Sequence, residues 1–288
     1  MEMFILKNNL KPYHMKKLKS VMFVLFMALV TKSVAQSEST EQLTVPLSNP
    51  GKSYTLKVNL IDGSIKVISY EGKDIIIDVS TPEEKGDGEK KDTENGMKRI
   101  SSSGSYEVTA KENDNTVTVN TSNPTRTFDL KLKIPKDVKL KVGTINNGDI
   151  EVENVTGELE VNNVNGEIKL NNISGSVVAN TVNGDVITTF NTVDPKAPMA
   201  FSTLNGDIKV TFPADVKANL KLKSDNGDIF SDFDIDLDKT KPKTNKTNEP
   251  GMYKIKMEGW VYGKINGGGP EILMKNMQGN IYVKKAGK

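Results

Sequence analysis

The sequence predicts an all-β fold, a single-stranded β-solenoid (β-helix) built from coils of about 18–22 residues with Asn-Gly corners. Three observations predict it. Glycine recurs every nine residues from Gly148 to Gly184, apolar and polar residues alternate within each nine-residue unit, and helical periodicity is missing after residue 35. A repeat this short cannot bury a core alone, so the units must stack.

Each nine-residue unit consists of a short strand and a corner. Counted from its glycine, a unit has apolar residues at positions three, five and eight, as in Gly-Asp-Ile-Glu-Val-Glu-Asn-Val-Thr from Gly148. Positions three and five share one face of a strand, and the shift to an even position requires a turn. Asn and Gly tolerate the positive φ of such turns. The predicted structural corners are Asn147, Gly148, Gly157, Asn165, Gly166, Gly175, Asn183, Gly184, Asn205, Gly206, Asn226 and Gly227.

The corners also predict which coils are neighbours. An Asn-Gly pair followed by an acidic residue occurs at glycines 148, 166, 184, 206 and 227. Coils are therefore expected to stack in that order at ~4.8 Å, and each should bury six apolar side chains, three from each unit. Asn154 is then expected above Asn172, and Asn163 above Thr181, in ladders of side-chain hydrogen bonds.

Strand patterns continue on both sides of the repeat. They cover residues 54–60, 61–65, 74–79, 106–110, 116–119 and 128–135 upstream, and residues 264–272 and 277–283 downstream. Trp260 and Tyr262 precede the last two segments and are expected to close that end of the core. Segments 81–99 and 236–250 are charged and poor in large apolar residues, which predicts flexible inserts.

The N-terminus is typical of a secretory signal peptide over residues 1–35. A basic Met-Lys-Lys-Leu-Lys segment precedes the apolar run 21–30, and Ser33-Val34-Ala35 is a small-x-small cleavage pattern. The apolar run spans only about half of a ~30 Å hydrocarbon core. Cleavage between Ala35 and Gln36 is therefore expected in place of a membrane anchor.

This processing predicts the domain organisation and the location. Residues 1–14 precede the basic segment and are interpreted as an upstream, wrongly assigned start. Residues 36–52 are predicted to be a linker, and residues 53–288 an adhesin-like solenoid domain. The mature chain has no further apolar stretch of membrane-spanning length. It is expected in the periplasm, in association with the outer membrane, or secreted.

Composition excludes several classes of function. Lys and Arg number 39 against 37 Asp and Glu, a net charge of +2 that does not fit a nucleic-acid-binding protein. The chain has no cysteine, and its one histidine, His14, lies in the segment expected to be removed. Disulfides, thiolate nucleophiles and Cys/His zinc sites are therefore excluded. Cleavage removes six lysines and one glutamate, which leaves 33 basic and 36 acidic residues and a net charge of −3.

Further motifs occur in a characteristic order around the repeat. Asp-Leu-Lys-Leu-Lys-Ile-Pro at 129–135 precedes Leu140 to Ile150 with its Asn-Gly-Asp-Ile, and a Gly267-Gly268-Gly269 turn precedes the last Gly-Asn-Ile. In this order the chain resembles the bacterial putative-adhesin family over about residues 54–283. The resemblance implies exported β-solenoid proteins with a domain of unknown function, for which adhesion is an assigned label. It supplies no catalytic residues to carry over.

An acidic residue follows most corner glycines and forms the candidate chemical site. These residues are expected to point outward in one column: Asp149, Glu167, Asp185, Asp207 and Asp228. The column is either a weak Ca²⁺ site or a solvated acidic stripe. Repulsion between neighbours ~4.8 Å apart is only about 0.9 kcal/mol in water, so charge balance does not require a metal.

Paired carboxylates also occur in polysaccharide-processing β-helix enzymes, either lyases or glycoside hydrolases. Glycoside hydrolysis needs two carboxyl groups in different environments, whereas a regular column gives all its members the same one. We therefore expect no catalytic residue, no metal and no cofactor. The sequence favours an exported, non-catalytic, adhesin-like module that binds an envelope or surface ligand, a glycan or a protein, or has a structural role in the envelope. The alternatives are the β-helix enzyme and a periplasmic envelope-stress component.

Overall fold

A computed structural model describes residues 41–81, 93–94, 97–98, 107–122, 126–239, 244–249, 252–257 and 259–287. The chain divides into two compact units, Met1–Glu38 and Ser39–Lys288, and the described residues belong to the second unit. The predicted signal peptide, with Ala35 and Gln36, lies outside the described residues, as do parts of both predicted inserts.

The described residues form strands and connecting turns. The strands are β1 (Glu41–Pro46), β2 (Tyr54–Asn59), β3 (Ile65–Ser69), β4 (Asp74–Ser80), β5 (Thr93–Glu94), β6 (Met97–Lys98), β7 (Val108–Asn113), β8 (Thr116–Thr121), β9 (Asp129–Ile134), β10 (Val138–Thr144), β11 (Ile150–Glu153), β12 (Thr156–Asn163), β13 (Ile168–Asn180), β14 (Val186–Val193), β15 (Met199–Asn205), β16 (Ile208–Phe212), β17 (Ala218–Asn226), β18 (Ile229–Ser231), β19 (Asp236–Leu237), β20 (Thr244–Glu249), β21 (Met252–Met257), β22 (Val261–Ile265), β23 (Glu271–Gln278) and β24 (Ile281–Lys285). In the first predicted insert β5 pairs with β6, and β20 of the second pairs with β21, which follows that insert; each pair is a separate two-stranded sheet.

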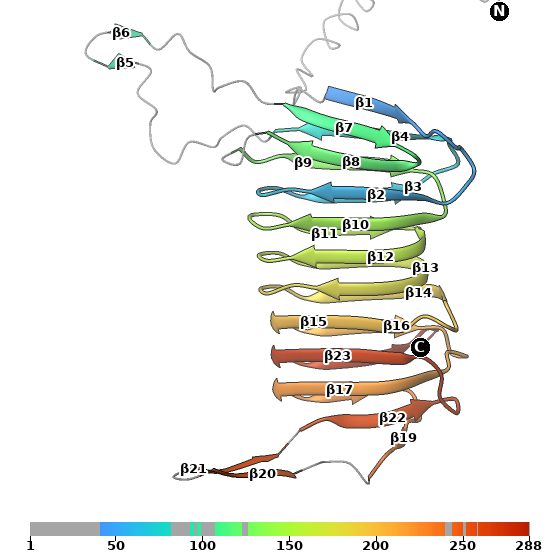
Figure 1. The fold of residues 1–288 in the computed structure, drawn as a ribbon, viewed down its shortest axis with the longest axis vertical. Coiled ribbons are helices and arrows are strands. Elements are labelled where there is room, and N and C mark those ends of the chain that lie inside the picture. The colour runs from blue at the N-terminus through green and yellow to red at the C-terminus, as the bar shows by residue number, and fades with distance from the viewer. Residues whose placement is uncertain are drawn as a thin grey trace, which may run out of the picture. The chain divides into compact units, whose positions relative to one another are not determined.

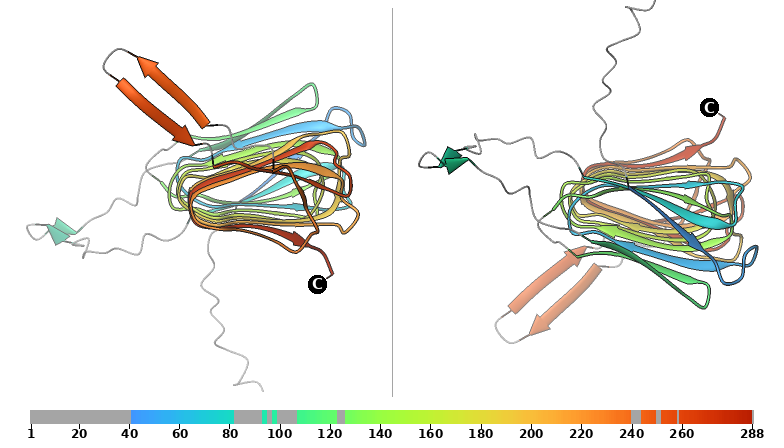
Figure 2. Two further views of the ribbon diagram at one scale, coloured as in Figure 1. Left: turned by 90° about the horizontal axis from the view of Figure 1, so that it is seen from below. Right: turned by 90° about the horizontal axis from the view of Figure 1, so that it is seen from above.

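The coils are made of two facing rows of parallel strands. The first row runs β8, β2, β10, β12, the second half of β13, β15, β23 and β17. The second row runs β9, β3, β11, the first half of β13, β14, β16, β24 and β18. Seen along the stack, the coils superpose as a flattened ring (Figure 2). The predicted β-solenoid with Asn-Gly corners is confirmed.

Two coils are stacked out of sequence order (Figure 1). The coil β2–β3 lies between β8–β9 and β10–β11, and the C-terminal coil β23–β24 lies between β15–β16 and β17–β18. Gly279 therefore separates the corners of Gly206 and Gly227. The prediction that the last two corners stack directly on each other was wrong. Residues 277–283 contain the same Gly-x-Ile pattern and occupy the intervening level in register.

Antiparallel strands cover both ends of the stack. At one end, β7 pairs with β8, β4 pairs with β9, and β1 pairs with β4. The segment expected to be a linker, 36–52, thus contains a strand of the fold. Val45 and Leu47 are buried there because apolar residues alternate with polar ones along β1.

At the other end, β22 pairs with β17 and β19 pairs with β22. Trp260 and Tyr262 do not close this end of the core, contrary to the sequence-based expectation. Tyr262 aligns with Lys221 on the outer face, and the Lys221 ammonium lies 4.9 Å from the centre of the Trp260 ring. Val261, Gly263 and Ile265 face inward from β22, and Ile265 is fully buried.

The core lies between the two rows of strands. At the Asn-Gly corner it contains fewer apolar side chains than the repeat predicts. The apolar residue at position eight is buried at Val155 and Ile173 but half-buried at Val164 and 37% exposed at Val182. Each of these coils therefore buries five apolar side chains where six were predicted. At the Asn-Gly corner the inward position is taken by a polar residue.

Candidate functional site: the Asn-Gly corner

The Asn-Gly corner brings the backbones of successive coils into close contact. Glycines stack there in a column, in the spatial order Gly63, Gly148, Gly166, Gly184, Gly206, Gly279 and Gly227. A Cβ added at Gly184, where φ is +147°, would lie 2.1 Å from the carbonyl oxygen of Gly166. Only glycine fits such a position. Gly157 and Gly175 form a second, shorter column at the opposite corner, where an added Cβ at Gly175 would lie 2.1 Å from Gly157 O.

Polar side chains on the core side bind the carbonyl groups of this glycine column. The hydroxyl groups of Thr181 and Thr203 donate to Gly166 O (3.1 Å) and Gly184 O (2.9 Å), and the Asn163 amide donates to Gly148 O (2.9 Å). Thr144, Asn276 and Ser224 make the corresponding bonds to Gly63, Gly206 and Gly279. The predicted ladder between Asn163 and Thr181 was therefore wrong, because both side chains turn inward to satisfy a carbonyl. Asn154 and Asn172 do form a side-chain hydrogen bond, of 3.1 Å.

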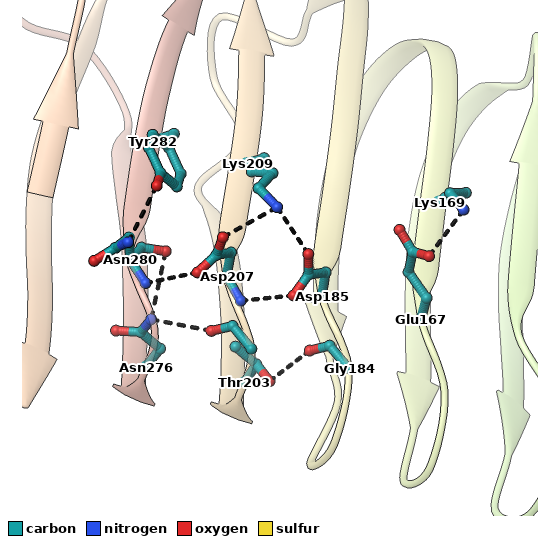
Figure 3. Close-up of polar contacts among 11 residues, drawn as sticks. Glu167, Lys169, Gly184, Asp185, Thr203, Asp207, Lys209, Asn276, Asn280 and Tyr282 are labelled. Atoms are coloured by element: carbon teal, nitrogen blue, oxygen red, sulfur yellow. Dashed lines mark hydrogen bonds and ion pairs between the residues drawn. The ribbon is translucent and has the colours of Figure 1, made fainter. Parts of the chain in front are cut away.

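Three of the acidic residues that follow the corner glycines accept a backbone N–H group of the next coil. Asp149 Oδ1 accepts the N–H of Glu167 (2.7 Å), and Asp185 Oδ1 accepts that of Asp207 (2.8 Å). Asp207 Oδ1 accepts the N–H of Asn280 (2.8 Å), as Figure 3 shows. Asn280 interrupts the predicted column, and its Oδ1 accepts the N–H of Asp228 at 2.9 Å.

Lysine side chains neutralise the same column. Lys209 Nζ lies 2.8 Å from Asp185 and 3.0 Å from Asp207, and Lys169 Nζ lies 2.8 Å from Glu167 (Figure 3). Burial opposes ionisation of Asp207, but the Asn280 N–H and the Lys209 ammonium outweigh it and lower the pKa of this carboxyl group. The side chains of Glu167, Asp185 and Asp207 are half-buried, whereas the solvated stripe considered from the sequence would leave them exposed. Within the described ranges, no three His, Cys, Asp or Glu side chains are grouped to hold a metal ion.

An exposed apolar stripe runs along the outside of the corner, and the sequence did not reveal it. We call it the corner stripe. Its members lie one per coil over six successive coils: Ile61, Ile145, Val164, Val182, Leu204 and Met277. Apart from half-buried Val164, each is 37–46% exposed. Large apolar side chains gathered on a surface are typical of interaction sites, whereas isolated ones are common on any surface.

A row of asparagine amides, the amide ladder, lies directly beside the corner stripe. Asn165 donates to Asn146 Oδ1 (3.5 Å), Asn183 to Asn165 Oδ1 (2.8 Å), and Asn205 to Asn183 Oδ1 (2.7 Å). All four side chains are exposed. The corner asparagines outside this ladder are Asn147, whose amide donates to Asp62 (2.9 Å), and Asn226, whose amide donates to Met277 O (3.2 Å).

One sequence signal distinguishes the two kinds of corner. Val164 and Val182 are followed by Asn-Gly, whereas the buried Val155 and Ile173 are followed by Thr-Gly and Ser-Gly. Asn163 and Thr181, which precede Val164 and Val182, take the inward position. Treating all nine-residue units as equivalent hides this difference.

The chain was compared with protein-family models, curated proteins and solved structures. A family model, Toastrack DUF4097, matches residues 129–283. A putative cell adhesion protein from Clostridium sporogenes ATCC 15579 is 13% identical, with a TM-score of 0.42 over 86% of this chain and 100% of that one. A putative adhesin from Bacteroides fragilis NCTC 9343 is 10% identical, with a TM-score of 0.30 over 86% of this chain and 98% of that one. No curated protein matches the sequence. In the described part of the chain, no helix has the length and apolar character needed to cross a membrane.

Proposed function

The chain belongs to the Toastrack DUF4097 family, and we propose that it is an exported, non-catalytic binding module of the bacterial cell envelope. Its ligand contacts the Asn-Gly corner. The observation that carries this proposal is the corner stripe, in which apolar side chains, five of them exposed, occupy the same position on six successive coils. Burying such a stripe against a ligand gains about 25 cal/mol per Å² of apolar surface.

The acidic column supports a structural role better than a catalytic one. Each of Asp149, Asp185 and Asp207 already accepts a backbone N–H from the next coil, and Lys209 binds the last two. A general acid needs a raised pKa, whereas the pKa of Asp207 is lowered. These contacts favour holding successive coils together over proton transfer.

The signal-peptide pattern at residues 1–35 supports export. N-terminal sequencing of the protein recovered from the envelope fraction tests this part, and we expect the mature chain to begin at Gln36. Protease treatment of intact cells then separates a surface protein, which is cleaved, from a periplasmic one, which is protected. Recovery of the full-length chain from the cytoplasm would contradict export.

Binding of the purified, labelled protein to intact cells of the source bacterium tests the proposed surface. Val182→Lys and Leu204→Lys place charges in the corner stripe and should abolish binding. Val178→Lys is the matched control, because Val178 is 40% exposed but lies on the strand face, away from the corner. Circular dichroism checks that all three variants are folded. Equal binding by the stripe variants and the control would overturn the proposal.

A further inference from the structure

We propose that the ligand of the Asn-Gly corner is an extended, uncharged polysaccharide lying parallel to the axis of the stack. This inference rests on the proposed function and names the ligand class for the same surface. It depends on three observations at the corner: the period of the corner stripe, the hydrogen-bonding groups of the amide ladder, and the absence of charged residues from the stripe and the ladder.

The period of the corner fits a linear polymer. The corner stripe repeats once per coil, so its six members extend over about 24 Å at the ~4.8 Å spacing of hydrogen-bonded strands. The amide ladder beside it has the same period. The sugar rings of an extended β-linked glycan recur at nearly this interval, so each ring lies against the side chains of one coil.

The hydrogen-bonding groups of the amide ladder fit hydroxyl groups. An amide has two N–H donors and an oxygen with two lone pairs. Asn183 uses one donor toward Asn165 and one lone pair toward Asn205. Each exposed amide within the ladder thus has a second donor and a second lone pair for a ligand. A sugar hydroxyl both donates and accepts, and the C–H face of a sugar ring suits the adjacent aliphatic stripe.

The backbone of the corner does not favour a peptide ligand. A peptide that extends a sheet needs unpaired backbone groups at the edge. The carbonyl oxygens of Ile145, Val164 and Val182 instead accept N–H groups of the next coil, at 3.1, 2.8 and 2.8 Å. The corner therefore offers its side chains for recognition. None of the ten residues of the stripe and the ladder is charged, which favours a neutral ligand over an acidic polysaccharide.

Isothermal titration of the purified protein with cello-oligosaccharides of increasing length tests the inference, with polygalacturonate as the anionic comparison. We expect affinity to rise from two to six sugars and to exceed that for the anionic polymer. Asn183→Ala should weaken binding of the longest oligosaccharide by about tenfold, the equivalent of one or two hydrogen bonds. Asn180→Ala is the matched control, because Asn180 donates to Asn162 (3.2 Å) in a different ladder on the strand face. Leu204→Lys should abolish binding.

Three results would overturn the inference: no binding of the neutral oligosaccharides, tighter binding of polygalacturonate, or equal losses in Asn183→Ala and Asn180→Ala. The cell-binding experiment keeps this outcome separate from failure of the proposed function. Loss of cell binding in Leu204→Lys, together with no binding of the oligosaccharides, would refute the polysaccharide and leave the corner as the binding surface. Cell binding that is unaffected by Leu204→Lys would refute the surface itself.

Discussion

Replacing Gly184 with alanine tests whether close backbone contact at the Asn-Gly corner holds the coils together. The new Cβ would lie 2.1 Å from Gly166 O, about 1 Å inside the 3.0 Å that Cβ atoms ordinarily keep. Backbone atoms on both sides prevent a local adjustment, so the two coils must separate at this corner. Gly267→Ala is the matched control, because Gly267 also has a positive φ (+86°) but an added Cβ there meets nothing within 4 Å.

The expected cost follows from the bonds that cross this corner. Separation breaks the hydrogen bonds from Thr181 Oγ1 to Gly166 O (3.1 Å), from Gly166 N to Asn183 O (2.8 Å) and from Ile168 N to Asp185 O (2.9 Å). At about 1 kcal/mol each, these contribute about 3 kcal/mol. The positive φ adds about 1–2 kcal/mol. Gly184→Ala should therefore cost about 4–5 kcal/mol, whereas the control should cost only the conformational part.

Thermal unfolding followed by circular dichroism measures the difference. At about 2–4 °C per kcal/mol for a domain of this size, Gly184→Ala should lower Tm by about 8–20 °C, and Gly267→Ala by about 2–8 °C. Urea unfolding should rank the two variants in the same order. Melting temperatures of the two variants within 2 °C of each other would show that the glycine column is not needed for close stacking.

Three further substitutions test the core, the corner hydroxyls and the acidic column. Ile168→Asp buries a charge in the core and should destabilise the array by more than about 4 kcal/mol. Lys169→Asp is the control, because it breaks only a surface ion pair worth about 0–1 kcal/mol. Equal Tm values for Ile168→Asp and wild type would refute the inward position of Ile168. Thr203→Val removes the donor to Gly184 O and should lower the free energy of unfolding in urea by about 1–3 kcal/mol. Thr192→Val is the control at an exposed position, and an equal loss in the two variants would contradict the prediction. The pKa of Asp207 is lowered in the folded chain, so its ionised form adds stability above the ordinary carboxyl pKa of about 4, and this stability is lost as pH falls through the folded value. Asp207→Asn should therefore lose less stability than wild type between about pH 5 and pH 2. The same loss of stability with falling pH in both proteins would exclude a contribution from ionised Asp207.

The sequence predicted the solenoid because its period, its strand alternation and its corner glycines are all local properties. The order of the coils is not local. Gly206, Gly227 and Gly279 are each followed by a polar residue and then isoleucine, so any one of these levels fits beside any other. The order depends instead on how the chain returns through β22 and the turn at 266–270, and the repeat contains no information about that path.

The corner stripe was missed for a different physical reason. An apolar residue in a repeat is normally assigned to the core, and Val155 and Val164 occupy the same position in consecutive units. The outcome depends on the preceding residue. Asn163 is placed inward because a buried glycine carbonyl needs a donor, and this turns Val164 outward. Whether the apolar or the polar side chain faces inward therefore depends on a carbonyl group of the neighbouring coil, which the repeat pattern alone does not show.

The interleaved coils have a consequence for the order in which the chain can fold. The coil β2–β3 is synthesised first, but both of its neighbours are present only after β11 has been made. The position between β16 and β18 is filled only by β24, which follows both of them in the sequence. Growth from one end, coil after coil, is therefore impossible. Contacts between segments so distant in sequence form slowly. The export proposed above would benefit from this arrangement, since the stack is completed only when β24 is available.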